Sequence, residues 1–361
     1  MALGYAGVSA RGPGTLTSVP CTDEATRVLL LSRADVEQLL DINALIDALA
    51  DAMTGLSTGR ASVPNRVAAL VAERDSLLAA MPAYDPANRA LTTKLVSLFP
   101  GNAGTHLPTH QAVIAAFDPA TGEPIALLDG TYITAMRTGA GSALSARLLA
   151  RPDASVLAII GTGVQARSHA RALPLVRDFT EVRVWGRDGA KAAALTEELI
   201  EAGLPAATAE SAEAALSGAD VVCATTHARA PVISDEWLTP GTHVTSVGYD
   251  PKGREVDDAT VTRARVFVES RAAALAPPPS GSPDLTDPIA KGLVSPDDIA
   301  EIGEVLLGTR PGRSSQEEIT LYKSVGVAVQ DAAAAAQVLA AATVGSVGQE
   351  VSLSRADLGV T

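Results

Sequence analysis

The residues of this sequence that could do chemistry gather first around a glycine-rich loop at positions 161–166. The loop reads Gly161-x-Gly163-x-x-Ala166, an apolar run over 156–160 precedes it, and a helical pattern follows it. In such a unit Gly161 permits a tight turn, Gly163 lets a pyrophosphate approach the backbone, and Ala166 lets the helix pack closely on the strand. A glycine pattern alone often marks only a structural turn, but this one lies between a strand and a helix. The sequence therefore predicts a dinucleotide-binding site.

The end of the next predicted strand, at residues 181–185, indicates which dinucleotide is bound. NAD enzymes place an acidic side chain there to hold the 2′-hydroxyl of the ribose. This sequence has Gly186 followed by Arg187. A glycine leaves room and an arginine can pair with a 2′-phosphate, so NADP(H) is the preferred cofactor and NAD(H) the alternative. In that alternative Arg187 is solvated and Asp188 takes the acidic role.

Two further charged residues stand out from their surroundings in the sequence. Lys94 lies in an apolar strand pattern, where a lysine is unusual. Asp250 follows the predicted strand 242–247, at its carboxyl end, where open α/β sheets bind their ligands. An aspartate at a strand end is more often a turn former or a cap, so its position alone leaves both interpretations open.

Strands and helices alternate after residue 151, which predicts an α/β domain with a Rossmann-type, doubly wound parallel sheet. Its helices are expected to end near residues 173 and 202. We assign this NAD(P)-binding domain to residues 146–317. The strands predicted in it are 155–160, 181–185, 221–224, 242–247 and 266–268.

The rest of the chain predicts a second, α+β domain for substrate binding and dimerisation, built from N- and C-terminal segments at 27–145 and 318–350. Ser32 is expected to cap a helix, and Asp41-Ile42-Asn43 to separate it from a second helix. Residues 131–150 form a long helix of small residues, and 319–344 a strand and an Ala-rich helix outside the dinucleotide unit. A flexible leader covers 1–26 and a tail 351–361. The expected strands are 28–31, 61–71, 77–83, 92–99, 110–118 and 124–129.

Composition excludes several classes of protein. The 361 residues carry a formal net charge of −13 without a Lys/Arg cluster, which argues against a nucleic-acid partner. No apolar run is long enough to span a membrane, and none resembles the core of a signal peptide. Cys21 and Cys223 lie far apart, which fits a reducing, cytoplasmic location, and Cys223 has the surroundings of a core residue. His106 and His110 flank a proline and share no helix face, so we expect no metal.

Seven short runs follow one another between about residues 28 and 345: 94–96 (KLV), 129–140 (DGTYITAMRTGA), 161–166 (GTGVQA), 247–251 (VGYDP), 301–304 (EIGE), 308–313 (GTRPGR) and 321–326 (LYKSVG). In their order and spacing the sequence resembles the ornithine cyclodeaminase/mu-crystallin family, which includes cyclodeaminases, alanine dehydrogenases and ketimine reductases. The resemblance implies a nicotinamide cofactor, a small amino or imino acid substrate, and a homodimer.

The resemblance also implies roles for individual residues. Arg66 matches a carboxylate-binding arginine, and Lys94 and Arg137 match further substrate contacts. Asp250 matches the residue that transfers a proton, with Lys94 as the second candidate, and Val325 borders the substrate. A forked arginine suits a carboxylate, and an imine accepts hydride readily once it is protonated. The cofactor contacts that we expect are Thr109, Arg137, Gly161, Thr162, Gly163, Val164, Gln165, Gly186, Arg187, Thr225, Val247, Gly248 and Ser324.

Three positions depart from the cyclodeaminases of this family. Ala79, ahead of Met81-Pro82, stands where they carry a glutamate for the side-chain amine of ornithine. Gly186 replaces the acidic ribose residue of their NAD-using members. The segment after Asp250 is one residue shorter than usual. The sequence is therefore closer to the NADP-dependent ketimine reductases of the family than to true ornithine cyclodeaminases.

These observations predict an NAD(P)H-dependent oxidoreductase that reduces a small carboxylate-bearing imine or, in reverse, dehydrogenates an amino acid. One alternative is a cyclodeaminase that keeps NAD tightly bound, because its net reaction consumes no hydride. Another is a non-catalytic, NADPH-linked binding protein of the mu-crystallin type. The presence of Arg66, Lys94 and Asp250 favours catalysis over binding alone.

Overall fold

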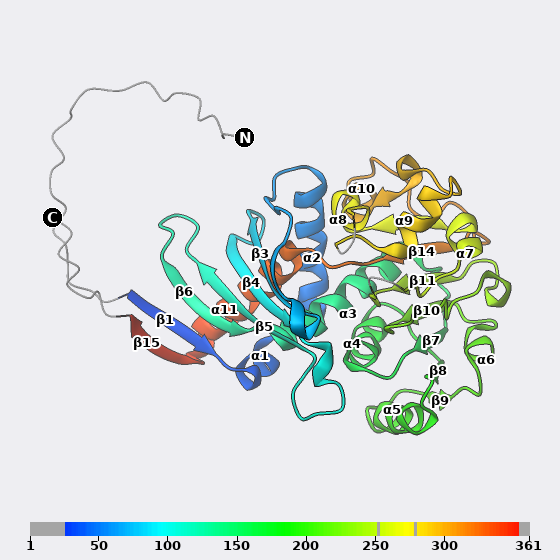
Figure 1. Ribbon diagram of the computed structural model, residues 1–361, viewed down its shortest axis with the longest axis horizontal. Coiled ribbons are helices and arrows are strands. Elements are labelled where there is room, and N and C mark those ends of the chain that lie inside the picture. Colours follow the sequence, from blue (N-terminus) through cyan, green and yellow to red (C-terminus); the bar gives the residue numbers. More distant parts are fainter. Residues whose placement is uncertain (1–25, 251–252, 278–279, 354–361) are drawn as a thin grey trace.

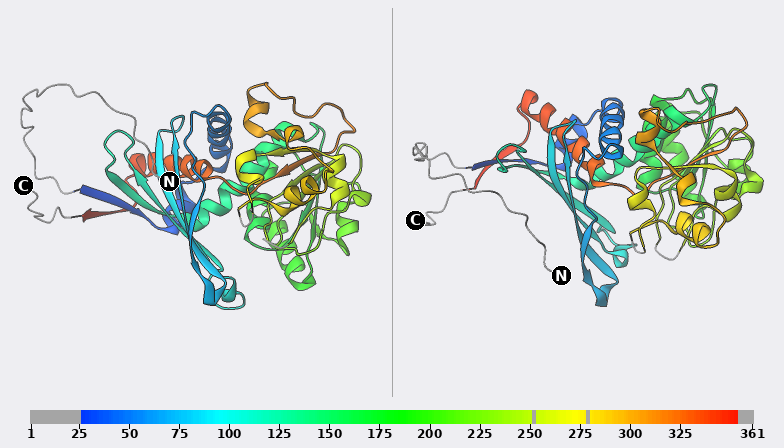
Figure 2. Two further views of the ribbon diagram at one scale, coloured as in Figure 1. Left: turned by 45° about the horizontal axis from the view of Figure 1, so that its top comes forward. Right: turned by 90° about the horizontal axis from the view of Figure 1, so that it is seen from above.

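The computed structural model describes residues 26–250, 253–277 and 280–353, and two β-sheets dominate it. Figure 1 shows the sheets in two lobes, and both views of Figure 2 keep the lobes distinct. The first sheet has the order β15 (Gln349–Leu353), β1 (Thr26–Leu31), β6 (Pro124–Asp129), β5 (His110–Phe117), β4 (Ala90–Leu98), β3 (Ser76–Asp85) and β2 (Val67–Val71).

The first sheet contains the antiparallel meander that the sequence predicts, from β2 to β6, with β1 added in parallel beside β6. The prediction of a strand over 61–71 was too long. Strand β2 begins only at Val67, and before it Ser62 forms a single bridge to Tyr84. The tail predicted at 351–361 was also misplaced, because β15 reaches Leu353 and pairs with β1. The leader before Thr26 and the end of the tail lie outside the described residues.

The second sheet is parallel throughout and confirms the doubly wound prediction. It has the order β13 (Ala300–Glu301), β12 (Arg265–Val268), β14 (Thr320–Lys323), β11 (His243–Ser246), β10 (Val221–Ala224), β7 (Val156–Ile160), β8 (Glu181–Trp185) and β9 (Ala206–Thr208). Its helices are α4 (Val164–Ala172), α5 (Gly189–Glu201), α6 (Ala212–Leu216), α7 (Asp258–Arg263), α8 (Arg271–Ala274), α9 (Pro283–Ala290) and α10 (Ile302–Leu306).

One expectation about this sheet was wrong. The sequence placed residues 319–344 outside the dinucleotide unit, yet β14 is an interior strand of the parallel sheet, between β11 and β12. Only the helix that follows, α11 (Ala328–Gly345), leaves for the first lobe, where it packs on α2 (Ile42–Ser57), β3 and β4. The boundary at residue 318 therefore cuts through a strand connection, and the remaining domain limits stay a prediction.

Local side-chain bonds explain where the first helices begin. Ser32 forms a capping box with Asp35 at the start of α1 (Arg33–Leu39), as its position predicts. The Asp41 carboxylate caps α2 through the amide of Ala44, so the break predicted at 41–43 is confirmed. Short 3₁₀ turns lie at Ala72–Arg74, Pro100–Asn102, Leu173–Leu175, Asp235–Trp237 and Pro296–Asp298.

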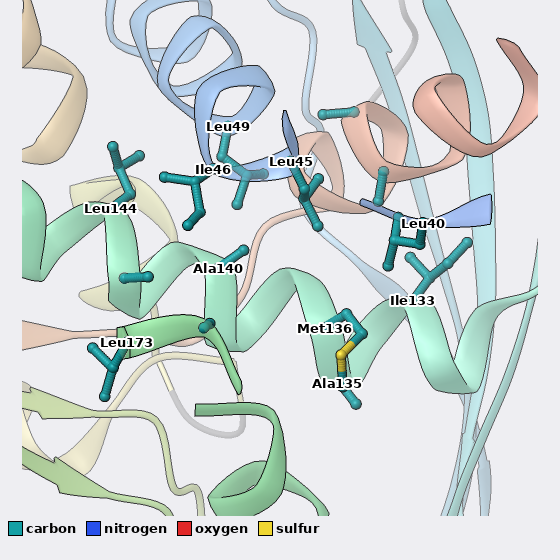
Figure 3. Packing of buried hydrophobic residues seen from close by; sticks show 14 of the residues in the cluster. Leu40, Leu45, Ile46, Leu49, Ile133, Ala135, Met136, Ala140, Leu144 and Leu173 are labelled. Carbon is teal, nitrogen blue, oxygen red and sulfur yellow. The ribbon is translucent and has the colours of Figure 1, made fainter. Parts of the chain in front are cut away.

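The helix α3 (Gly130–Leu149) joins the two lobes and is buried on every side from residue 133 to 146. Figure 3 shows Leu45 and Ile46 of α2 against one side of it and Leu173 of the second lobe on the other. Small residues make this possible. A Cβ atom added at Gly139 would lie 2.7 Å from the carbonyl oxygen of Ser168 on α4, so the two backbones nearly touch.

Two expectations remain, one about the cysteines and one about membrane-spanning segments. Cys223 on β10 is fully buried, as a core residue should be, and burial raises the pKa of its thiol well above the ordinary value. Cys21 lies outside the described residues. In the described part of the chain, no helix combines the length and the apolar character that crossing a membrane would need.

Candidate active site

The glycine loop has the geometry of a tight turn between β7 and α4. Gly161 has a φ of +119°, and a Cβ atom there would lie 2.5 Å from the Thr225 hydroxyl oxygen. The Thr225 hydroxyl in turn donates to the carbonyl of Ile160, 3.0 Å away, across the point where the strand order reverses. Only glycine fits this position. The loop lies at the carboxyl end of β7, beside the point where the strand order reverses, and doubly wound sheets bind dinucleotides there.

The loop leaves open space where a pyrophosphate would approach. Gly163 is the N-cap of α4 and makes no side-chain capping bond, and a Cβ atom added to it would meet nothing within 4 Å. Val164 at the first helical position is 66% exposed, which is high for an apolar residue beside a sheet edge. The uncapped amides and the helix dipole fit the phosphates of a nicotinamide dinucleotide.

The ribose position is shaped by contact between two predicted cofactor residues. A Cβ atom at Gly186 would come within 2.6 Å of the Thr162 methyl group, so Thr162 fills the place of a side chain there. Arg187 beside it is exposed. Asp188 caps α5 by accepting bonds from the amides of Ala190 and Lys191 at 3.1 and 3.2 Å. Helix capping thus occupies the carboxylate that was the alternative ribose ligand.

A buried cluster of charges joins three elements, β4, α3 and α11. Lys94 on β4 and Arg137 on α3 both bind Asp331 on α11, with Nζ–Oδ2 and Nε–Oδ1 distances of 2.7 and 3.1 Å. Gln330 accepts a bond from Nη1 of Arg137 at 3.0 Å. All four side chains are buried. The cluster holds two cations against one carboxylate, so it has capacity for a further anion.

Burial and neighbouring cations lower the pKa of Lys94 in this cluster and of His110 near it. Burial lowers the pKa of Lys94 to about 8, and Asp331 partly opposes that shift. The pKa of His110 is lowered to about 4, first by burial and then by the charges of Lys94 and Arg137. His110 is therefore neutral at physiological pH and adds no charge to the site.

Arg66 reaches this region from the rim. It is exposed, and its Nη2 donates to the carbonyl oxygens of Val325 and Gly326 at 3.3 and 3.1 Å. Gly326 also touches the cluster, because a Cβ atom on it would lie 2.7 Å from Nη1 of Arg137. Arg66 lies before β2, whereas the turn 324–326 follows β14, so the two lobes meet at the site.

The turn 324–326 is bound by Glu269, whose fully buried carboxylate directly follows β12. Glu269 accepts a short bond from the Ser324 hydroxyl and bonds from the amides of Val325 and Gly326 at 3.3 and 3.2 Å. Ser324 itself is buried. This arrangement fixes two predicted contact residues, Ser324 and Val325, relative to the parallel sheet.

A second buried network fixes the loop that carries Asp250. Lys323 is fully buried, and its Nζ contacts Asp284 at 2.9 Å and the carbonyl of Gly248 at 2.7 Å. Glu255 accepts a bond from the amide of Gly248 at 2.8 Å. Asp250 forms an ion pair with the exposed Arg229, at 3.5 Å between Nε and Oδ2. Asp250 lies four residues beyond Ser246, the last residue of β11, on the side where the parallel strands end.

The structure brings together most of the predicted site, in two groups. One contains the glycine loop with Thr225, Gly186 and Arg187, and the other Lys94, Arg137, Arg66 and the turn 324–326. Thr109 is exposed, and its carbonyl accepts the amide of Phe99 beside His110. Sequence reasoning missed Gln330, Asp331, Glu269 and Lys323. Two polar residues in the otherwise apolar run AVQDAAAAA were the available signal for the first two.

Comparison with known proteins identifies the family. The family model described as "Ornithine cyclodeaminase/mu-crystallin family" matches residues 26–345. The chain belongs to this family. Ketimine reductase mu-crystallin of Mus musculus is 38% identical over 313 residues, which covers 84% of this chain and 94% of the relative.

Two solved structures of related proteins also match. Δ1-pyrroline-2-carboxylate reductase of Thermococcus litoralis, in complex with NADH and L-proline, is 38% identical with a TM-score of 0.86, and the match covers 90% of this chain and 100% of that one. An archaeal alanine dehydrogenase dimer with bound NAD is 32% identical with a TM-score of 0.84, covering 91% and 99%.

The family and the dinucleotide loop agree about the kind of chemistry. This member of the ornithine cyclodeaminase/mu-crystallin family is an NAD(P)-dependent oxidoreductase that acts on carbon–nitrogen bonds. The protein has both an uncapped helix terminus after Gly163 and a buried cationic cluster around Asp331.

Proposed function

We propose that the protein reduces a small cyclic imino acid with NADPH, with Arg66, Lys94 and Arg137 binding the carboxylate. The observation that carries the proposal is the buried cluster in which Lys94 and Arg137 share the single carboxylate of Asp331. A monoanionic ligand balances this excess of positive charge. Arg66 at the rim adds a forked donor suited to carboxylates.

The surroundings of Lys94 favour a substrate whose remaining part is apolar. Met81 lies opposite Lys94 on the neighbouring strand. Met81 belongs to a buried hydrophobic cluster that also contains Ala79, Val96 and Ala112. Ala79 offers no carboxylate to a side-chain amine. A ring made of methylene groups suits such a wall better than a diamino acid does.

A bound nicotinamide supplies the hydride that reduces the imine carbon. The protein's part is to orient the imine by its carboxylate and to place a proton on its nitrogen. Asp250 is our first candidate for that proton, and Lys94, with its pKa lowered to about 8, is the second. Addition of one hydride and one proton converts the imine to the secondary amine of a cyclic amino acid.

The cofactor preference proposed for NADPH rests on the ribose position. Gly186 carries no carboxylate, the carboxylate of Asp188 caps α5, and Arg187 is exposed beside them. A 2′-phosphate would meet the cation of Arg187 there, while the adjacent carboxylate of Asp188 is bound by two amides of α5. NADH remains usable, because the pyrophosphate site around Gly163 is independent of the 2′-position.

We also propose that the protein forms a two-fold homodimer through the outer face of its first sheet. Leu78, Leu95, Val113 and Leu127 lie on this face and are between 41% and 48% exposed. Alternate residues of the same strands are buried against the helices. An apolar sheet face of this extent favours burial against a second copy, and the related alanine dehydrogenase is a dimer.

Consumption of NADPH and NADH tests the proposal, with a panel of five- and six-membered cyclic imino acids and the same imines without the carboxylate. We expect stoichiometric oxidation of NADPH with the imino acids. For the imines that lack the carboxylate, kcat/KM should be at least about 10-fold lower, as for the loss of charged hydrogen bonds. Conversion of ornithine to proline without net NADPH consumption would instead indicate a cyclodeaminase. Tight binding without turnover would indicate a binding protein.

A further inference from the structure

We infer that Glu269 is a positioning residue for Arg66, acting through the turn 324–326. The inference rests on the proposed role of Arg66 in binding the substrate carboxylate. Glu269 directly follows β12, and β12 pairs in parallel with β14, whose last residue Lys323 precedes the turn. This register places the fully buried carboxylate beside the turn 324–326.

One peptide group connects the two charged residues. Its amide, on Gly326, donates to Oε1 of Glu269 at 3.2 Å, and its carbonyl, on Val325, accepts from Nη2 of Arg66 at 3.3 Å. The peptide therefore lies between an anion and a cation, and each bond polarises it in the direction that strengthens the other. The next carbonyl, on Gly326, accepts a second bond from the same Arg66 nitrogen at 3.1 Å.

The other contacts of Glu269 keep this peptide in place. Ser324 and the amide of Val325 both donate to the same carboxylate, so three consecutive residues are tied to one fully buried side chain. Gly326 has a φ of +72° and packs against the guanidinium of Arg137. A shift of the turn would therefore move the anchor of Arg66 relative to the buried cluster.

Arg66 needs such an anchor because it is exposed and its side chain is long. An arginine with free rotamers loses side-chain entropy when it binds a ligand, and that loss weakens binding. Two carbonyl acceptors fixed in advance order the guanidinium before the substrate arrives. The predicted consequence is a lower KM for the carboxylate substrate, with little effect on the chemical step.

The variant Glu269→Gln keeps the size of the side chain and removes its charge. Its NH₂ group donates and cannot accept both amides and the Ser324 hydroxyl, so the turn loses an acceptor. We expect KM for the cyclic imino acid to rise about 10-fold, the scale of a charged hydrogen bond. The value of kcat should change less than about 3-fold, and NADPH affinity, measured by fluorescence titration, should change less than the substrate KM.

A double-mutant cycle with Arg66→Ala shows whether Glu269 acts through Arg66. If it does, Glu269→Gln raises KM in the wild type and has little further effect in the Arg66→Ala background. Equal effects in both backgrounds would overturn the inference. A parallel loss of NADPH affinity would also overturn it, because the effect would then pass through Ser324. An unchanged KM in Arg66→Ala alone would instead refute the proposed role of Arg66.

Asp220→Asn is the matched control. Asp220 also accepts two backbone amides, those of Ser155 and Val156, and binds Arg151, but it lies at the amino-terminal end of the parallel sheet. We expect it to lower the unfolding temperature without changing KM. If Glu269→Gln fails to fold, Glu269→Asp keeps the charge with a shorter reach, and it should show a smaller KM increase with the same dependence on Arg66. A KM unchanged by Glu269→Asp in a folded protein would then count against the inference.

Discussion

Lys94 is buried, and its ammonium group is stabilised by the carboxylate of Asp331, with 2.7 Å between Nζ and Oδ2. Burial lowers the pKa of Lys94 to about 8. Below pH 8 the ammonium is protonated and can attract a substrate carboxylate, and above pH 8 it loses that charge. We expect KM for the imino acid to rise as the pH increases from 7 to 9.5.

The variant Lys94→Arg tests this pH dependence, because a guanidinium stays charged throughout the range. In this variant the alkaline increase in KM should disappear, even if its absolute KM is higher. Steady-state kinetics at five or more pH values would measure both proteins. A wild-type KM that is flat up to pH 9.5 would contradict the assignment of Lys94 as a carboxylate contact.

Asp250 has a different expected role, because it lies beyond the carboxyl end of β11 and forms an ion pair with the exposed Arg229. If Asp250 holds the proton for the imine nitrogen, Asp250→Asn should lower kcat by about 10² to 10⁴. NADPH affinity should stay nearly the same. Nearly normal kcat of Asp250→Asn across the pH range would exclude Asp250 as the proton donor and favour Lys94 in that role.

Arg187 is the residue that should distinguish the two nicotinamide dinucleotides. Replacing it with alanine removes a charged contact to the 2′-phosphate, which is worth roughly 1.5–3 kcal/mol. We expect kcat/KM for NADPH to fall while that for NADH stays constant. Arg60→Ala, an exposed arginine after α2, serves as the control. Equal use of both cofactors by the wild type would falsify the preference for NADPH.

At the scale of elements, a chain of buried hydrogen bonds fixes α3 against the second lobe. Thr245 on β11 donates to the Ser142 hydroxyl at 2.7 Å, and Ser142 lies 2.8 Å from Nε2 of His169 on α4. Nδ1 of His169 lies 2.7 Å from the carbonyl of Gln165, which makes it the donor and Nε2 the acceptor. The network is satisfied only when His169 is neutral.

This network predicts how stability depends on pH. Burial lowers the pKa of His169 to about 4 and that of His243, which bonds Ser145 and Thr320, to about 3. The unfolded chain takes up these protons below about pH 6.5 and the folded protein does not, so the free energy of unfolding should fall from pH 6.5 to 4. Denaturant unfolding of wild type and His169→Gln at several pH values would test it.

The pH slope should be smaller in His169→Gln than in the wild type, although that variant is less stable at pH 7.5. His106→Gln is the control, because His106 is exposed and lies outside the network. Identical slopes in wild type and His169→Gln would show that this histidine is not responsible.

At the scale of the whole molecule, the outer face of the first sheet should determine the oligomeric state. Leu95 and Val113 are directly opposite on β4 and β5, and are 42% and 45% exposed. Light scattering should give a dimer mass at micromolar concentration. Leu95→Lys and Val113→Lys should each shift it toward the monomer, because a buried unpaired charge is costly. Ile200→Lys, at the 54% exposed end of α5, should leave the mass unchanged.

Most helices, most strands and the dinucleotide loop could be predicted from the sequence, because they depend on local patterns. Apolar periodicity and capping residues such as Ser32 and Asp41 act within a few residues, and Gly161 is required by the backbone of its own turn. The errors concerned the ends of strands and the pairing of strands that are distant in the sequence. β14 has the same apolar pattern wherever it pairs, so only its neighbours β11 and β12 show that it belongs to the parallel sheet.

The contacts among the charged residues could not be predicted, because they join elements that are distant in the sequence. Lys94, Arg137 and Asp331 come from β4, α3 and α11, and no local pattern records that they share one buried site. The packing of α3 between the lobes fixes their distances, and burial then sets the pKa of Lys94. A resemblance to relatives could suggest Lys94 and Arg137, but Asp331 and Glu269 became visible only through their contacts. Side-chain partners depend on how elements pack, whereas element formation depends mainly on neighbours along the chain.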